Sequence, residues 1–226
     1  MYKITFFIRA PHLISYTDKP MFDALMAYCA AKEYVQNLSF KLTYTQDEID
    51  FVNSKIPLKK DAYDCFIAST MLFNKNETSE QRINWTKHWD SANDELANFG
   101  KKARKINVTS GEFKSYRVAL NVHQHKEVFF YFDSENVELV KYLLTKHLPS
   151  IGKKRSSGYG EIQNFVVEKI DYNPFEEDIL RPIPMESIGN MQEFIQKYGN
   201  KYYSRYTACK PPYHQSANFK DCIVPN

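Results

Sequence analysis

The beginning of the chain alternates between apolar and polar side chains. Tyr2, Ile4, Phe6 and Ile8 occupy one set of alternate positions, and mainly polar side chains occupy the other. Because successive side chains of a strand point to opposite faces, this pattern predicts a half-buried strand over residues 2–9.

A helical period follows at Phe22, Leu25, Met26 and Cys29, which recur with spacings of three and four residues. Side chains spaced in this way share one face of a helix. The pattern therefore predicts an amphipathic helix over about residues 21–34. Asp23, in its first turn, is interpreted as a structural residue.

A second helix is expected after residue 134. Val137, Val140, Leu144 and Leu148 form its apolar stripe. We expect Ser134 to cap its beginning, since a serine hydroxyl accepts from the free N–H groups of a first turn, and the proline that follows to end it.

Other segments have the alternating or continuous apolar pattern of strands. They are residues 40–75 with a loop at 53–61, with 65–72 the clearest strand, then 116–123, 128–132 as a central strand, and about 161–170. Residues 77–100 are polar and are expected to be irregular or partly helical. From residue 174 onward six prolines interrupt any regular pattern, which predicts an extended segment packed on the domain or on a partner.

The order strand, helix, strands, strand, helix, loop, strand is that of a split βαβ unit. It predicts an α+β chain with a ferredoxin-like (RRM-like) domain over residues 1–170. A large insertion at about 74–115 is expected between its two halves. Residues 171–226 are expected to form the extended C-terminal segment.

Composition narrows the class of protein. The 226 residues are 43% hydrophobic and 15% aromatic, enough for a packed core, and no run of 18 uncharged apolar residues predicts a membrane span. The first residues do not have the pattern of a signal peptide, and the four cysteines are widely spaced without a C-x-x-C pair. These features predict a cytoplasmic protein with reduced thiols and without a membrane partner.

Positive charge is concentrated in two segments, although the formal net charge is only +3. Residues 101–117 contain six basic side chains and one acid, and residues 146–160 contain four basic side chains and no acid. Together they predict a localised site for a polyanion. Each segment taken alone also fits an ordinary solvated surface.

Three of the seven glycines lie between residues 152 and 160, mixed with three cations and two serines. Glycine lets backbone N–H groups approach phosphate oxygens closely, and the cations would neutralise them. The loop lacks the G-x-x-x-x-G-K-[ST] motif, and the helix that a dinucleotide fingerprint requires is not expected after it. A plain turn with an exposed basic tip is the alternative.

A glycine-rich loop between the last helix and the last strand of such a unit resembles the signature of the CRISPR-associated RAMP superfamily. Further segments are similar to one branch, the RAMP subunit of type IV CRISPR effector complexes. The similar segments are 19–28 (KPMFDALMAY), 111–117 (GEFKSYR), 151–160 (IGKKRSSGYG), 181–184 (RPIP) and 211–213 (PPY).

The resemblance implies a non-catalytic subunit that binds the 5′ handle of crRNA and caps the backbone filament. It also implies contacts with the backbone subunit and with the large subunit, and an indirect association with target DNA and a helicase. Target specificity would come from guide pairing, while the protein binds phosphates and recognises the shape of the nucleic acid.

The candidate RNA-binding residues are the cations of both basic segments and the polar residues of the glycine loop. They are Lys153, Lys154, Arg155, Ser156, Gly158, Tyr159, Lys101, Lys102, Arg104, Lys105, Lys114 and Arg117. Tyr159 either stacks on a base or packs under the loop. Lys114 and Tyr116 are expected on one strand face and Arg117 on the other, with Tyr116 either in the core or at the ligand.

Three alternatives concern other residues. Lys3, Phe7 and Arg9 share the non-core face of the first strand, which either binds RNA or is a solvated or partner-covered face. If the chain is instead a metal-independent crRNA-processing endoribonuclease of the superfamily, its catalytic pair would be His12 and Tyr16. His123 and His125 would share a strand face but lack an evident third metal ligand, so no metal and no cofactor is predicted.

Overall fold

The computed structural model describes residues 1–9, 19–35, 45–74, 79–90, 107–111, 113–153, 155–199 and 201–225. The side chains of residues 79, 80, 120–123 and 156 lie outside this description. In chain order the elements are β1 (Tyr2–Ile8), α1 (Phe22–Tyr34), α2 (Gln46–Ser54), β2 (Ser79–Lys87), β3 (Tyr116–Gln124), β4 (Glu127–Phe132), α3 (Val137–His147), η5 (Arg155–Ser157), β5 (Ile162–Lys169), α4 (Pro174–Glu177), β6 (Ile183–Pro184), η6 (Met185–Ser187), α5 (Met191–Tyr198), β7 (Tyr202–Ala208), η7 (Ser216–Asn218) and β8 (Phe219–Pro225).

The central sheet is antiparallel, with the strand order β4-β1-β5. Ile4 pairs with Phe130 on one side and with Val167 on the other. The segment 65–72, predicted as a strand, adds only isolated bridges to the free edge of β4, at Ala68 with Phe132 and at Leu72 with Phe129. In the hydrogen-bonded sheet β1 is therefore the central strand, and β4, predicted as central, is at the edge with this irregular segment beside it.

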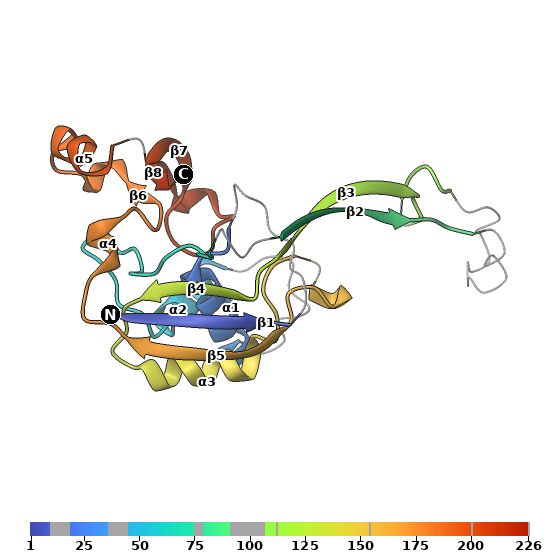
Figure 1. Ribbon diagram of the computed structural model, residues 1–226, viewed down its shortest axis with the longest axis horizontal. Coiled ribbons are helices and arrows are strands. Elements are labelled where there is room, and N and C mark those ends of the chain that lie inside the picture. The colour runs from blue at the N-terminus through green and yellow to red at the C-terminus, as the bar shows by residue number, and fades with distance from the viewer. Residues whose placement is uncertain are drawn as a thin grey trace.

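Helices α1 and α3 cover one face of this sheet, and Figure 1 shows the strands in front of α1 with α3 below them. Ile4 and Phe6 of β1 are fully buried, as their alternation predicted. Phe22 of α1 packs on Phe130 and Phe132, with ring centroids 5.4 and 4.8 Å apart. The core of the domain thus lies between the two helices and the sheet.

The beginning of α3 differs from the prediction in one detail. The cap is Asn136, whose side-chain oxygen accepts from the N–H of Leu139 at 3.0 Å. Ser134 is buried and donates instead to the carbonyl oxygen of Pro57. Its hydroxyl also accepts from the N–H of Asn136 at 3.1 Å, so it positions the cap rather than being the cap.

The prediction of a strand over the beginning of residues 40–75 was wrong, because Gln46–Ser54 is the helix α2. A capping box starts it: the hydroxyl of Thr45 accepts from the N–H of Glu48, and the Glu48 carboxylate accepts from the N–H of Thr45. The threonine and the glutamate three residues later are a sequence signature of a helix start.

The prediction of an irregular region over residues 77–100 was wrong for its first part. Ser79–Lys87 is β2, which pairs along its whole length with β3. Figure 1 shows this two-stranded ribbon extending away from the central sheet. The strand character of β2 is weak in the sequence because only Ile83 and Trp85 among its nine residues are apolar.

The prediction of an extended tail was also wrong. Residues after 174 form α4, α5 and a second antiparallel sheet in the order β6-β8-β7. The prolines interrupt no element: Pro174 is at the first position of α4, Pro184 lies on the edge strand β6, and Pro225 ends β8. These are positions where a missing N–H is tolerated.

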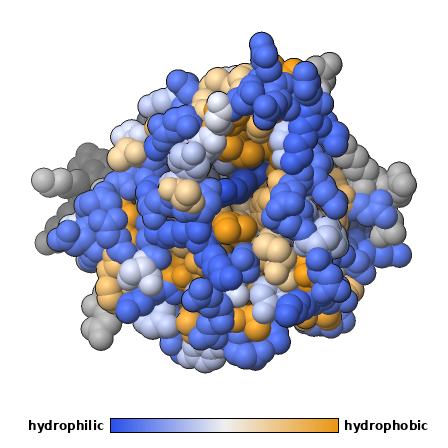
Figure 2. Space-filling model, turned by 90° about the vertical axis from the view of Figure 1, so that its left-hand side faces the viewer, coloured by the Kyte–Doolittle hydropathy of each residue, from blue (hydrophilic) through white to orange (hydrophobic). Residues whose placement is uncertain are grey.

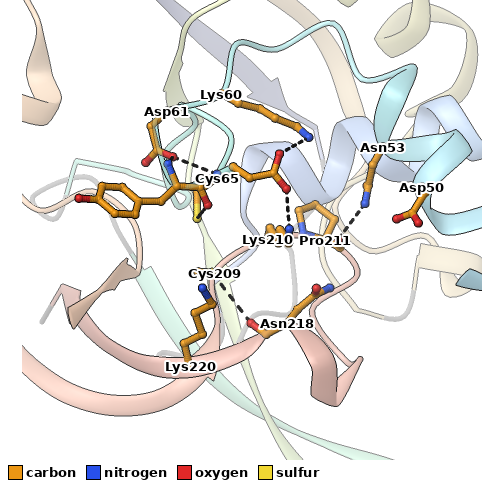
Figure 3. A network of polar contacts seen from close by, with 12 residues as sticks. Asp50, Asn53, Lys60, Asp61, Cys65, Cys209, Lys210, Pro211, Asn218 and Lys220 are labelled. Carbon is orange, nitrogen blue, oxygen red and sulfur yellow. Dashed lines mark hydrogen bonds and ion pairs between the residues drawn. The ribbon is translucent and has the colours of Figure 1, made fainter. Parts of the chain in front are cut away.

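Polar contacts attach this C-terminal region to the central domain (Figure 3). The amide of Asn53 in α2 donates to the carbonyl oxygen of Pro211 at 3.2 Å, and Lys210 pairs with Asp64 at 2.6 Å. Arg181 pairs with Asp61 and donates to the carbonyl oxygen of Phe66 at 2.7 Å. The two regions are therefore held together by several hydrogen bonds and ion pairs.

Three of the four cysteines meet at the same junction. Cys65, Cys209 and Cys222 pack in one buried cluster with Val224, and all are free thiols. The thiol of Cys222 donates to the carbonyl oxygen of Thr207 at 3.6 Å, and the thiol of Cys65 donates to that of Tyr63 at 3.7 Å. The wide spacing of these cysteines in the sequence gave no sign that they meet in the fold.

The helices of the described ranges are too short or too polar to cross a bilayer.

Candidate nucleic-acid interface

The glycine loop lies between α3 and β5 and is closed at its base by backbone hydrogen bonds. The N–H of Ile151 donates to the carbonyl oxygen of Gly160 at 2.8 Å, and the N–H of Ile162 to that of Pro149 at 2.9 Å. Between these bonds the chain turns through η5. The loop is thus a closed projection whose base is fixed to the end of the central sheet.

The glycines are needed for the backbone conformation of this loop. Gly152, Gly158 and Gly160 have φ values of 95, 85 and 69°, in the left-handed region that other residues rarely adopt. A side chain added at Gly158 would meet nothing within 4 Å, so backbone conformation rather than space requires glycine there. The exposed Gly158 turn leaves its backbone accessible to a ligand.

Arg155 lies against the first helix. Its guanidinium carbon is 4.8 Å from the ring centroid of Tyr28 in α1, and the side chain remains exposed. Its positive charge also opposes the effect of burial on Cys29, whose thiol pKa burial raises to about 12. α1 thus supports a cation that faces solvent.

Tyr159 lies between the loop and the ribbon of β2 and β3. Its ring centroid is 6.2 Å from that of Trp85 in β2, at an interplanar angle of 60°, and the side chain is only partly buried. The loop therefore presents the exposed cations Lys153 and Arg155 beside two partly exposed aromatic rings. This combination of cations and flat rings suits single-stranded nucleic acid.

The ribbon has two chemically different faces. Because directly opposed residues point to the same side, Trp85 shares a face with Val118, and Lys87 shares it with Tyr116. Thr86 is opposite Arg117 on the other face. Trp85 was missed as a site residue because its segment was expected to be irregular, although Ile83 and Trp85 alternate with polar residues there.

The predicted positions of the ribbon cations are partly corrected. Lys114 does not share a strand face with Tyr116, because the strand begins at Tyr116 and Lys114 lies in a turn closed by its N–H on the carbonyl oxygen of Gly111. Tyr116 is 39% exposed and not in the core. Arg117 is exposed on the face away from Trp85, so it does not converge with the glycine loop.

The model of the family described as CRISPR type IV associated protein Csf3 matches residues 1–225. The chain belongs to this Csf3 family. The resemblance to a type IV CRISPR subunit is thereby confirmed across the chain, and membership supports a place in a CRISPR effector complex. No curated protein matches the sequence.

Several of the site residues predicted for this Csf3-family chain lie outside the described residues. They are Lys101, Lys102, Arg104, Lys105 and Lys154, together with the alternative catalytic pair His12 and Tyr16 and the side chain of Ser156.

The open face of the central sheet is less suited to nucleic acid than the glycine loop. Lys3 and Phe7 lie on this face, and Lys3 Nζ is 4.8 Å from the ring centroid of Phe129. However, Glu168 is opposite Lys3 and Glu127 is opposite Phe7, which places two acids on the same face. Their charges would repel phosphates, which favours the solvated or partner-covered alternative.

Arg9 and the histidines depart from the predicted strand geometry. The register shifts after Phe7, and Arg9 pairs with Glu161 beside the glycine loop at 3.2 Å. His125 follows the end of β3 and is buried against Phe73, with ring centroids 4.1 Å apart. Within the described ranges no three His, Cys, Asp or Glu side chains form a group able to hold a metal ion.

Proposed function

We propose that this chain is the crRNA-binding subunit of a cytoplasmic type IV CRISPR ribonucleoprotein, holding the 5′ handle of the guide and capping the backbone filament. Membership of the Csf3 family supports the assignment to the complex. The observation that carries RNA binding is the convergence of Lys153, Arg155, Tyr159 and Trp85 at one end of the central sheet.

We further propose that the central domain has the ferredoxin-like fold of RAMP proteins. The order β1, α1, segment 65–72, β4, α3, β5 supports it, because it follows the split βαβ pattern. The bridges of the segment to β4 give the spatial order segment-β4-β1-β5. The glycine loop then lies between the last helix and the last strand of the unit.

Within the complex, the loop cations would neutralise handle phosphates while Tyr159 and Trp85 offer rings to unstacked bases. The ribbon of β2 and β3 extends beyond the domain, which suits contact with the adjacent backbone subunit (Figure 1). The large subunit would be a second protein partner. Target DNA and a helicase would associate through these subunits, with guide pairing supplying specificity.

Charge reversal in the loop tests this role. We expect Lys153→Glu with Arg155→Glu to weaken guide RNA binding about tenfold or more, because two phosphate contacts become repulsive. The slope of the log of the binding constant against log salt should also become less negative by about 1.4. Each phosphate contact with a single strand contributes about 0.7 to this slope. Fluorescence anisotropy over a salt series measures both quantities.

The matched control is Lys55→Glu with Lys169→Glu, which makes the same change of charge at exposed residues away from the loop. Complexes purified with partner subunits should retain guide RNA in the control and lose it in the loop variant. Equal RNA content in the two complexes would contradict the assigned site.

We propose that the role is non-catalytic. Purified protein incubated with repeat RNA in EDTA should leave the RNA intact over hours, as judged on a denaturing gel. Cleavage that disappears in His12→Ala would instead assign the chain as a metal-independent endoribonuclease, because a general acid–base residue is required at the scissile phosphate.

A further inference from the structure

A second surface with candidate chemistry lies away from the glycine loop, between the C-terminal sheet and the beginning of α1. It is an open cleft of about 1180 Å³. Figure 2 shows that one face of the molecule is hollowed, with apolar surface next to hydrophilic surface there. Ligand pockets commonly measure about 300–1,000 Å³, so the cleft has room for a segment of chain rather than one small molecule.

One wall of the cleft is a face of the sheet formed by β7 and β8. Tyr203 is opposite Val224 and Arg205 is opposite Cys222, so these four side chains share one face. Val224 and Cys222 pack toward the central domain with Cys65. Tyr203 and Arg205 therefore face the central domain across the cleft, and both side chains are exposed.

The opposite wall comes from the central domain and is mainly apolar. Pro20 and Met21 precede α1, and Leu72 and Phe73 follow the segment that bridges to β4. Lys19 lies at this wall, with its Nζ 5.2 Å from the ring centroid of Phe73. The attraction between an ammonium group and the face of an aromatic ring holds the positive charge at this wall of the cleft.

The charges of the lining are predominantly positive. Among the described residues, Lys19, Lys201 and Arg205 line the cleft together with one acid, Asp178, whose carboxylate is 3.8 Å from Lys201 Nζ. An excess of positive charge in a partly enclosed site attracts anions strongly, because the field is less screened there than on an open surface.

Two partly exposed aromatic rings of β7 line the cleft, Tyr203 on the face toward the central domain and Tyr206 on the alternate face of the strand. Tyr203 is 41% exposed and Tyr206 is 63% exposed, while both line the cleft. Rings that served only to pack the core would be covered. Exposed rings among cations are the features on which successive bases stack while their phosphates are neutralised.

We propose that this cleft is a second binding site, which takes a short stretch of single-stranded nucleic acid. Tyr203 stacks on a base inside the cleft and Tyr206, on the alternate face of β7, offers a second ring at its margin, while Lys19, Lys201 and Arg205 neutralise phosphates. An acidic peptide would use the cations but not both rings, which is why nucleic acid is favoured. The site is separate from the glycine loop and does not depend on the function proposed for it.

Photocrosslinking of the full chain tests the assignment without a variant. Ten-nucleotide RNA containing 4-thiouridine and the matching DNA containing 4-thiothymidine are crosslinked separately, and the modified peptides are identified by mass spectrometry. Crosslinks at Tyr203 or Tyr206 are expected. The oligonucleotide that gives these crosslinks, RNA or DNA, shows which kind of strand the cleft binds. Crosslinks confined to residues 153–159, or absent with both oligonucleotides, would overturn the proposal.

Binding measurements separate the two sites. In the Lys153→Glu, Arg155→Glu background, adding Tyr203→Ala and Lys201→Glu should weaken oligonucleotide binding about fivefold to a hundredfold, as expected for lost stacking and charge. The control adds Tyr34→Ala and Lys197→Glu, exposed residues outside the cleft, and should change nothing. Equal affinities of the two variants, or equally effective competition by polyglutamate, would overturn the nucleic-acid assignment. If the Lys153→Glu, Arg155→Glu variant binds the oligonucleotide as tightly as the wild type while the cleft substitutions weaken binding, only the function proposed above is contradicted.

Discussion

Replacing Phe22 with alanine is expected to lower the free energy of unfolding by about 3–5 kcal/mol, the range for deleting a buried phenylalanine ring. Phe22 is fully buried at the beginning of α1. Its ring packs on Phe130 and Phe132, at centroid distances of 5.4 and 4.8 Å. The variant therefore loses the transfer free energy of the ring and leaves a cavity between α1 and the sheet.

Equilibrium unfolding in urea measures this loss, with far-ultraviolet circular dichroism as the signal. Phe51→Ala is the matched control, because Phe51 lies in α2 with 45% of its surface exposed. It should cost less than about 1 kcal/mol, since surface substitutions rarely matter more. A similar loss in the two variants would mean that Phe22 is not the contact that joins α1 to the sheet.

The second large effect concerns a buried carboxyl group. Asp23 is 1% exposed and accepts from the hydroxyl of Tyr213, which lies 2.9 Å from both carboxylate oxygens. Burial raises the pKa of Asp23 from 3.8 to about 7, against the opposing effect of the Tyr213 hydrogen bond. The contact links α1 to the Pro-Pro-Tyr segment, and it confirms the interpretation of Asp23 as structural.

The sign of the pH dependence follows from this raised pKa. Between about pH 4 and pH 7 the folded chain holds the Asp23 proton and the unfolded chain does not. This group's contribution to stability therefore falls as pH rises through that window and is constant above it. The contribution falls by about 1.4 kcal/mol for each pH unit of this window.

Asp23→Asn removes this titration. Urea unfolding at pH 5 and at pH 8 should show the variant gaining stability relative to the wild type at the higher pH, by a few kcal/mol. Asparagine retains an oxygen that can accept from Tyr213. If the free energies of unfolding of wild type and variant differ by the same amount at the two pH values, the raised pKa is contradicted.

Tyr213→Phe serves as the companion variant because it removes only the donor. Leaving a buried acceptor without its partner should cost about 1–3 kcal/mol. The pH dependence should extend to a higher pH, since the hydrogen bond from Tyr213 lowers the Asp23 pKa and its loss raises the pKa further. A pH dependence that ends at a lower pH than in the wild type would contradict this coupling.

Much of the central domain could be predicted from the sequence because its elements bury one face. The alternation around Ile4 and Phe6 and the stripe around Val140 and Leu144 reflect burial directly. Where the apolar pattern is weak the prediction failed: the ribbon strand Ser79–Lys87 is mostly polar, and α2, which a capping box begins, lies in a segment expected to be a strand.

The candidate site was predicted in part for a related reason. Glycine clustering and cations are local features, so Lys153, Arg155 and Tyr159 could be identified from the sequence. Trp85 and Tyr28 could not, because their role arises from contacts with the loop across the fold. Prolines in turn suggested an extended C-terminus, although their positions at element ends permit a sheet there.

The sequence by itself determined the main strands and helices of the central domain, the glycine loop and the resemblance to type IV CRISPR proteins, since each is encoded by neighbouring residues. Only the tertiary structure decided the meeting of Cys65 with Cys209, the C-terminal sheet and the cationic cleft. The bond from Tyr213 to Asp23 spans 190 positions. Contacts at such separation leave no periodic signal, because they depend on how completed elements pack and not on the order of residues within any one of them.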